Sequence, residues 1–316
     1  MIEQVTDKII NGYEITKEEA MLLYELPVEE LVKQANQLRI VFCGESFDLC
    51  TIINGKSGEC SEDCKYCAQS GHYHTKSEVF PLRKEEIIVN DAIINEKKGV
   101  GRYSIVTSGK RASEKEVDKI CSIYQSIREK SLIKLCASLG LLGYESLLKL
   151  KAAGVVRYHN NLETSRRFFP SICTTHTYDE KIQTIKAAQR SGLEVCCGGI
   201  IGLGETVEDR IDMAFELKAL KIQSIPLNLL NAIEGTPLAG VEKVTQEEFI
   251  KIASIYRFIH PHAVIRLAGG RNLLTDFGRE LFASGVNGTI TGELLTTYGN
   301  DTDSDVKMIR KLGYRV

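Results

Sequence analysis

The chain has 316 residues, 43% of them hydrophobic and 26% charged, and its 40 basic and 42 acidic side chains give a formal net charge of −2. These are the proportions of an ordinary globular protein, and the charge balance gives no electrostatic reason to expect binding to nucleic acid or to an anionic membrane surface. No apolar stretch approaches the ~20 residues of a membrane span, and the first residues lack the basic and apolar regions of a secretory signal. We therefore expect a cytoplasmic protein.

The first 40 residues have a helical pattern. Thr16 and Glu19 have the T-x-x-E spacing of a capping box ahead of an apolar run, and Pro27 suits the first turn of a second helix. We assign residues 1–48 to an N-terminal helical extension.

From residue 49 onward, short β-branched apolar runs alternate with longer segments of helical period, such as 113–129. The predicted strands are 49–54, 101–107, 132–137, 155–160, 193–198, 222–228, 263–268 and 286–290. This alternation indicates an α/β fold with a parallel sheet, and eight strands favour a closed (β/α)8 TIM-type barrel over residues 49–316. A doubly wound open sheet is the alternative.

Three of the ten cysteines, Cys60, Cys64 and Cys67, form a C-x3-C-x2-C triplet directly after the first predicted strand. In a reducing cytoplasm, ten cysteines indicate metal binding or catalysis rather than a disulfide framework. Loops that follow barrel strands form the active face of such folds. Three soft thiolates suit a 4Fe–4S cluster and leave one iron open for a substrate or cofactor.

A structural zinc site is the alternative for the same loop. The triplet together with His72 or His74 would give a tetrahedral Cys3His set. Structural zinc modules usually draw their ligands from two paired knuckles, so we favour the iron–sulfur interpretation.

The triplet, with Tyr66 just before its last cysteine, resembles the signature of radical S-adenosylmethionine enzymes. The longer string NGKSGECSEDCKYCAQS is similar to the biotin synthase family in particular. Further segments that resemble this family follow in order along nearly the whole chain: YHNNLETS at 158–165, CCGGIIGLGET at 196–206, IPLNLLNAIEGTPL at 225–238, RLAGGR at 266–271 and LLTT at 294–297.

The resemblance implies radical insertion of sulfur into dethiobiotin, driven by 5′-deoxyadenosyl radicals from reductive cleavage of S-adenosylmethionine. It also implies an external one-electron donor of the flavodoxin or ferredoxin type, iron–sulfur assembly machinery and a homodimer. The implied 4Fe–4S ligands are Cys60, Cys64 and Cys67. The implied contacts to S-adenosylmethionine are Tyr66, Asn161, Glu163, Gly198, Gly199 and Glu205, and those to substrate are Asn161, Asn228, Thr296 and Thr297.

The family also carries an auxiliary iron–sulfur cluster, usually 2Fe–2S, that donates the sulfur. Cys136, Cys196 and Arg266 match three of its ligands, whereas Ser104 stands where the family pattern has cysteine. Serine is a harder and poorer iron ligand than a thiolate, so we expect a cluster of altered ligation or nuclearity. Cys197 is a candidate replacement, although successive strand residues point to opposite faces and it would need a bulge.

The remaining cysteines are expected to be structural: Cys50 as a core residue of the first strand, and Cys43, Cys121 and Cys173 as inert thiols. Two other functions remain as alternatives. One is a radical enzyme of the hydrogenase-cofactor maturase type, which shares the barrel but acts on another small substrate. The other is a non-catalytic metal-binding or electron-carrier protein.

Overall fold

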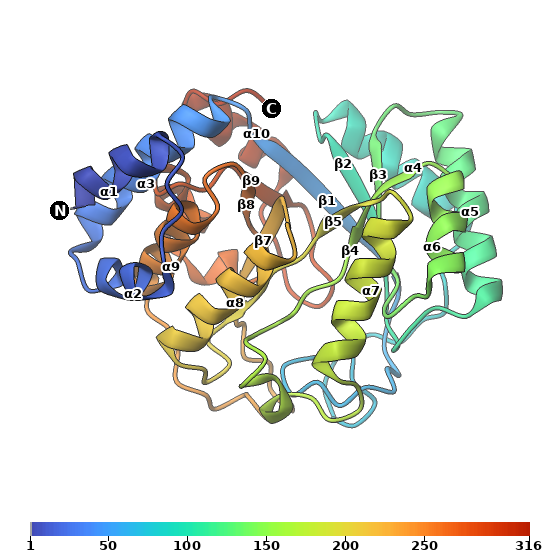
Figure 1. Ribbon diagram of the computed structural model, residues 1–316. Coiled ribbons are helices and arrows are strands. Elements are labelled where there is room, and N and C mark those ends of the chain that lie inside the picture. The colour runs from blue at the N-terminus through green and yellow to red at the C-terminus, as the bar shows by residue number, and fades with distance from the viewer. Residues whose placement is uncertain (1) are drawn as a thin grey trace.

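The computed structural model describes residues 2–316 and consists of a parallel barrel surrounded by helices (Figure 1). The strands are β1 (Asp48–Lys56), β2 (Arg102–Thr107), β3 (Lys134–Ser138), β4 (Val155–His159), β5 (Glu194–Cys196), β6 (Gly199–Ile201), β7 (Ser224–Leu229), β8 (Val264–Leu267) and β9 (Gly288–Thr291). The α-helices are α1 (Ile2–Ile10), α2 (Lys17–Tyr24), α3 (Val28–Cys43), α4 (Glu85–Lys97), α5 (Glu114–Arg128), α6 (Tyr144–Ala152), α7 (Tyr178–Arg190), α8 (Val207–Ala219), α9 (Gln246–Ile259) and α10 (Thr302–Lys311). Short 3-10 helices are η1 (Phe169–Ser171), η2 (Arg271–Leu273) and η3 (Thr275–Ala283).

The sheet closes on itself, which excludes the open-sheet alternative. Strand order is β5-β4-β3-β2-β1-β9-β8-β7-β6, and β5 also pairs with β7. Because β5 and β6 both pair with β7, they are two halves of one barrel strand, and the barrel has the eight strands that the sequence predicted. The predicted strand limits agree with the observed ones to within two residues, except that the strand predicted at 193–198 continues to Ile201 as β6.

The interruption between β5 and β6 has a local cause in the neighbouring strand. Pro226 lies inside β7 and has no N–H to donate to the ladder. Gly198 lies against it so closely that a Cβ at this position would collide with the Pro226 carbonyl oxygen. Only glycine can therefore occupy position 198.

Capping boxes mark the start of several helices. In α2, the backbone N–H of Glu19 donates to Thr16 Oγ1 at 3.2 Å and the Thr16 N–H donates back to the Glu19 carboxylate at 2.9 Å, which confirms the predicted box. Pro27 lies one residue before α3, where its fixed φ angle suits a helix start. The same reciprocal bonds begin α5, α7, α8 and α9.

The helices α1, α2 and α3 precede the barrel and cover one side of it, next to α8 and α9 (Figure 1). This leaves α9 almost wholly buried between the extension and the sheet. None of the helices in residues 2–316 has the length and apolar character that crossing a bilayer requires.

Candidate active site

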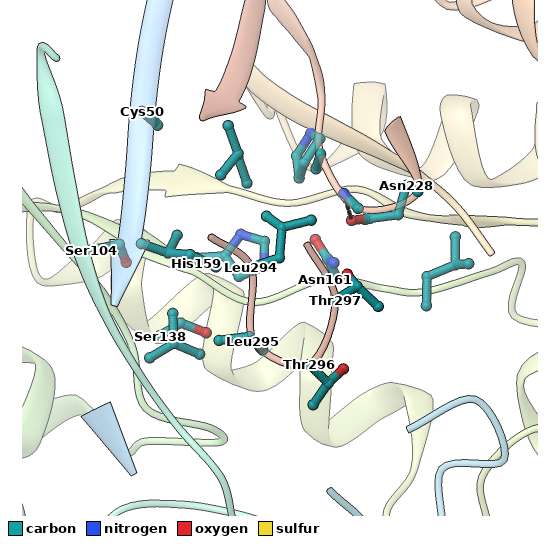
Figure 2. Close-up of a pocket in the computed structure, with 18 of the residues that line it drawn as sticks. Cys50, Ser104, Ser138, His159, Asn161, Asn228, Leu294, Leu295, Thr296 and Thr297 are labelled. Carbon is teal, nitrogen blue, oxygen red and sulfur yellow. Dashed lines mark hydrogen bonds between the residues drawn. The ribbon is translucent and has the colours of Figure 1, made fainter. Parts of the chain in front are cut away.

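A cavity of about 370 Å³ lies inside the barrel. Its wall combines residues of the strands with residues of the loops that follow them, among them the loop that carries the cysteine triplet and the loop 294–297. Figure 2 shows Cys50 and Thr296 near opposite ends of this space, with Ser104, His159 and Asn161 between them. The strands thus form a floor, and the loops at their carboxyl ends form a mouth.

The cysteine triplet lies at the mouth on the loop after β1. Cys60, Cys64 and Cys67 are all half-buried free thiols, and Cys67 and Tyr66 line the cavity. The loop is held by backbone bonds, from Cys60 N to Gln69 O at 3.0 Å and from Cys67 N to Cys64 O at 2.9 Å. The triplet is therefore a defined turn rather than three cysteines on a loose segment.

A second thiol group lies at the floor, on three different strands. Cys136 of β3 and Cys196 of β5 line the cavity together with Arg266 of β8, as the sequence predicted. Cys50 of β1 joins them: it lines the same cavity, and an Arg266 guanidinium nitrogen contacts its Sγ. The expectation that Cys50 belongs to the core was wrong, because its side chain faces the lumen and not the surrounding helices.

The other two residues weighed for this group differ in their placement. Ser104 of β2 lines the cavity, and its strand register places it beside Cys136. Cys197 is fully buried in the hydrophobic core and is absent from the cavity wall. The break that follows Cys197 does not turn its side chain inward, so alternation along the strand keeps it on the outer face.

Arginines make the floor positively charged. The buried carboxylate of Asp48 accepts from Arg102 Nε at 3.1 Å and lies 3.1 Å from Arg266 Nη2 and 3.5 Å from Arg157 Nη1. Burial alone would raise the pKa of Asp48, but Arg266 and the two other guanidinium groups outweigh it and hold the pKa well below its usual range. Glu194 also pairs with Arg157 at 2.9 Å and lies 3.7 Å from Arg102, so three arginines face two carboxylates and leave one excess positive charge beside the thiols.

One thiol of the floor has a lowered pKa. Burial would raise the pKa of Cys196, but a hydrogen bond with His159 and the charge of Arg266 outweigh it and lower the pKa to about 6. Burial raises the pKa of Cys136 to about 11 and that of Cys50 further still. Nothing in the sequence pattern singled out His159, because this histidine matches no metal-binding spacing.

The floor fits an iron–sulfur group by its donor chemistry. It combines three thiols with a guanidinium, and the Nε of Arg266 is buried without a hydrogen-bond partner among the described residues. An unpaired buried N–H is costly, so a ligand that accepts from it would stabilise this arrangement. The triplet at the mouth likewise offers three soft thiolates on one turn, the donor set that an iron–sulfur cluster with an open iron requires.

Two asparagines brace the wall between mouth and floor. Asn161 Oδ1 accepts from Gly198 N at 3.0 Å, which fixes the chain at the strand break. Asn228 Oδ1 accepts from Gly269 N at 2.8 Å while its Nδ2 donates to Gly199 O at 2.9 Å. Both asparagines line the cavity, and each therefore combines a backbone-bracing role with a polar surface toward the lumen.

Glu163 lies beside Asn161 in an unusual backbone conformation. Its φ angle of 72° is in the left-handed region, and Asn161 Nδ2 donates to its carboxylate at 3.3 Å. Neighbouring backbone bonds from Glu163 N to Gly198 O and from Ile200 N to Glu163 O hold this conformation. A strained residue kept in place at a cavity wall is typical of a ligand-binding position.

The glycine turn contributes less to the lumen than the sequence suggested. In the described chain, the cavity wall includes none of Gly198, Gly199 and Glu205. Glu205 is buried and pairs with Arg210 at 2.6 Å, while its Oε1 also accepts from Gly202 N at 2.8 Å. Its other oxygen has no hydrogen-bond partner among the described residues.

Thr296 and Thr297 lie on the loop that closes the mouth after β9, and both line the cavity (Figure 2). The loop is tied to the barrel where Asn54 of β1 donates to the Leu295 carbonyl at 3.0 Å. The backbone of this loop is therefore anchored next to the threonine pair.

Comparison with known proteins adds family information to this geometry. Residues 56–217 match the Radical SAM superfamily, and residues 226–315 match the Biotin and Thiamin Synthesis associated domain. The chain is 55% identical to a biotin synthase of Clostridium botulinum over 100% of this chain and 99% of that protein. It is 52% identical to a biotin synthase of Brachyspira hyodysenteriae over 100% of this chain and 95% of the relative.

A solved structure is similar in fold at much lower sequence identity. Methylornithine synthase superposes with a TM-score of 0.86 at 19% identity, covering 98% of this chain and 96% of that one. This likeness concerns the barrel architecture alone.

Proposed function

Because the chain belongs to the biotin synthase family, and is therefore a radical S-adenosylmethionine sulfurtransferase, we propose that its cavity binds S-adenosylmethionine at the mouth and dethiobiotin between mouth and floor. The observation that carries this assignment is the placement of two thiol groups at opposite ends of one cavity. One end suits the generation of a radical, and the other suits the supply of sulfur. We further propose that residues 49–316 form the catalytic barrel and residues 1–48 an extension.

At the mouth, Cys60, Cys64 and Cys67 are the residues that would hold the 4Fe–4S cluster. When bound, this cluster supplies the electron that splits S-adenosylmethionine into methionine and a 5′-deoxyadenosyl radical. Tyr66 lines the cavity next to the triplet and offers an aromatic surface for the adenine. Glu163 and Asn161 present polar groups to the ribose and amino acid parts of the same molecule.

The glycine turn has an indirect part in this binding. Gly198 and Gly199 position Asn161 and Asn228 through backbone bonds, and Glu205 holds the following turn through Gly202. We propose that these three residues shape the site for S-adenosylmethionine.

Dethiobiotin has a ureido ring at one end and a carboxylate at the other. Asn228 and Asn161 offer the amide groups that would pair with the ring, and the Thr296 and Thr297 hydroxyls would donate to the carboxylate. The wall between them is largely apolar, including Ile52, Ile200 and Leu229. An enclosed apolar wall excludes solvent from the space in which the radical would form and limits side reactions.

At the floor, Cys136, Cys196 and Arg266 would hold the auxiliary cluster, which supplies the inserted sulfur. We propose that Cys50, which contacts Arg266, is a better candidate for the fourth ligand than Cys197, which lies in the hydrophobic core. The cluster is therefore of altered ligation relative to the usual 2Fe–2S form, with Ser104 as a neighbour.

The remaining assignments follow from the family and the thiol chemistry. We propose a cytoplasmic homodimer that receives electrons from a flavodoxin or ferredoxin and is loaded by iron–sulfur assembly machinery. The ten cysteines are free thiols, the form in which they can serve as ligands. The hydrogenase-maturase alternative has only the shared fold in its favour: the maturase HydG from Carboxydothermus hydrogenoformans superposes with a TM-score of 0.85 at 16% identity, covering 99% of this chain and 78% of that one.

The test is an anaerobic assay of the reconstituted full-length chain with S-adenosylmethionine, dethiobiotin and a low-potential reductant. We expect biotin and 5′-deoxyadenosine to form together. Cleavage of S-adenosylmethionine that is unaffected by dethiobiotin, with no biotin formed, would instead favour a different substrate.

Mössbauer spectra and sulfide analysis test the auxiliary site separately. We expect Cys50→Ala to change the auxiliary signal more than Cys197→Ala does. An ordinary 2Fe–2S signal that is unchanged in both Ser104→Ala and Cys50→Ala would refute altered ligation.

A further inference from the structure

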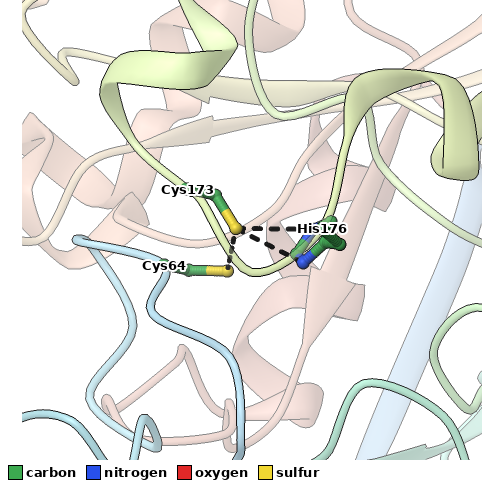
Figure 3. Close-up of side chains that lie close together, drawn as sticks. All are labelled: Cys64, Cys173 and His176. Atoms are coloured by element: carbon green, nitrogen blue, oxygen red, sulfur yellow. Dashed lines mark hydrogen bonds between the residues drawn. The ribbon is translucent and has the colours of Figure 1, made fainter.

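Outside the cavity, Cys64, Cys173 and His176 lie together at the junction of two loops (Figure 3). Cys64 belongs to the triplet loop, and the other two residues belong to the segment between η1 and α7. Cys173 and His176 are both buried, at 3% and 7% exposure. The sequence placed Cys173 among the inert thiols, whereas the structure places it beside two other possible metal ligands.

The two loops are held together independently of these three side chains. The Asp63 carboxylate accepts from the backbone N–H groups of Thr174 at 2.8 Å and Thr175 at 3.1 Å. Lys65 N donates to Ile172 O at 2.9 Å. Because Asp63 and Lys65 flank Cys64, its thiol is fixed opposite Cys173.

Cys173 lies from Cys64 and His176 at distances close to the edges of a tetrahedral metal site, and one donor atom of each of the three residues lies within 4.8 Å of the others. The Sγ atoms of Cys64 and Cys173 are 3.7 Å apart, and Cys173 Sγ lies 3.3 and 3.8 Å from the two ring nitrogens of His176. Zinc–sulfur bonds of about 2.3 Å and zinc–nitrogen bonds of about 2.0–2.1 Å give tetrahedral edges of about 3.8 Å between sulfurs and about 3.5 Å between sulfur and nitrogen.

The residues around His176 orient its ring so that one nitrogen is free to bind a metal. Its Nδ1 lies 2.6 Å from a carboxylate oxygen of Glu62, whose side chain is 8% exposed. An Nδ1–H that donates to Glu62 leaves the Nε2 lone pair free, which is the carboxylate–histidine arrangement found behind many zinc ligands. The edge of the Phe169 ring packs against the imidazole, with centroids 5.6 Å apart, and limits its rotation.

We propose that Cys64, Cys173 and His176 bind a zinc ion in the chain that carries no cluster at the triplet, with Glu62 orienting His176 through Nδ1 and a water completing the tetrahedron. Two thiol protons are released on binding, because the thiolate is the ligand form. Cys64 is shared, so zinc and the 4Fe–4S cluster exclude one another. The exclusion rests on the proposed function, whereas zinc binding does not.

Zinc binding is tested by adding Zn²⁺, and Co²⁺ as a coloured probe, to the reduced, cluster-free full-length chain under anaerobic conditions. We expect one tightly held ion per chain, with the absorption of tetrahedral thiolate-bound cobalt. Cys173→Ala, the near-isosteric Cys173→Ser and His176→Gln should lose it. Glu62→Gln should weaken it by about 10–100-fold, as outer-shell partners do.

Matched controls separate this site from the triplet itself. Cys60→Ala removes a triplet thiol but none of the three proposed zinc ligands, and Cys43→Ala removes a distant thiol, so both should retain the ion. Circular dichroism identifies any variant that does not fold. Because three different substitutions at Cys173 and His176 are tested, misfolding of one of them still leaves the others to report on zinc binding. Loss of the ion in Cys60→Ala with retention in both Cys173 variants would overturn the proposal in favour of a triplet zinc site. Failure of the unaltered chain to bind would also overturn it.

Competition with the cluster is measured as the rate of iron–sulfur reconstitution, followed by visible absorption. Zinc loaded beforehand should slow reconstitution in the unaltered chain and not in Cys173→Ala. Equal slowing in both would overturn the exclusion. Zinc binding is measured without substrate or cluster, so it stands or fails separately from biotin formation.

Discussion

The mouth and the floor of the cavity both gather cysteines, but they are built in different ways. The mouth triplet lies on one continuous loop, half-exposed and held by a few backbone bonds. The floor draws Cys50, Cys136 and Cys196 from separate strands and surrounds them with buried ion pairs. The mouth can therefore lose a thiol at little cost to folding, whereas the floor combines the site with the stability of the barrel.

The sharpest contrast is expected from a single triplet substitution. Cys67→Ala should abolish cluster binding and reduce cleavage of S-adenosylmethionine below detection. The free energy of unfolding of the cluster-free chain should change by less than about 1 kcal/mol, because the side chain is half-buried on a loop. Iron analysis, product chromatography and urea unfolding measure these quantities, with Cys121→Ala as a control. A large loss of stability would show that the mouth is as structural as the floor.

At the floor, Asp48→Asn should lower the free energy of unfolding, which Cys67→Ala should leave nearly unchanged. It leaves the guanidinium groups of Arg266, Arg157 and Arg102 without their shared buried carboxylate. Breaking a buried ion pair from one side costs about 3–5 kcal/mol, which urea unfolding would show. Glu194→Gln is the control: Glu194 pairs with Arg157 at 2.9 Å but is 57% exposed, so its removal should cost at most about 1 kcal/mol.

This contrast also explains what the sequence could predict. The triplet is a local pattern, and the eight strands follow from local alternation, so both could be found along the chain. The role of Cys50 could not, because β1 runs beside β2 and β9 and only barrel closure brings its side chain to Arg266. Cys173 was missed for the same reason: its partner Cys64 is 109 residues away.

A substrate contact at the mouth should affect binding without affecting folding. Thr297→Val removes a hydroxyl proposed to donate to the dethiobiotin carboxylate. Hydrogen bonds to charged groups contribute about 1.5–3 kcal/mol, so the KM for dethiobiotin should rise about 10–100-fold. Steady-state or single-turnover biotin formation would show this, and Thr297→Ser should restore much of the loss. An unchanged KM would remove the threonine pair from the substrate site.

Acid should weaken the ion pairs of the floor. The pKa of Asp48 is held well below its usual range by Arg266 and its neighbours, against the opposing effect of burial. The stabilisation is therefore complete above the unfolded-state pKa of about 3.9 and decreases as the pH falls below it. Between pH 6 and pH 3 this residue alone should cost the folded state about 1.3 kcal/mol, a loss that Asp48→Asn should lack. Unfolding at both pH values, compared between the two proteins, measures this difference.

The smallest expected effect lies away from both ends of the cavity. Thr245→Ala removes the exposed cap of α9, where Glu248 N donates to Thr245 Oγ1 at 3.2 Å. Loss of a helix cap costs about 1 kcal/mol. Iron content and KM should not change. If they do, α9 is coupled to the cavity more closely than its position behind the sheet suggests.

One strand connects the two ends. β1 begins with Asp48 and Cys50 at the floor, reaches the mouth loop through Asn54, and continues directly into the triplet segment. The length of β1 therefore sets the reach of the site, that is, the distance between the place where the radical forms and the source of the sulfur. Two residues inserted into it would keep every side chain on its own face yet lengthen that reach by about 7 Å. The length of this strand thus limits which molecules can span the gap, and engineering for longer or shorter substrates would begin there.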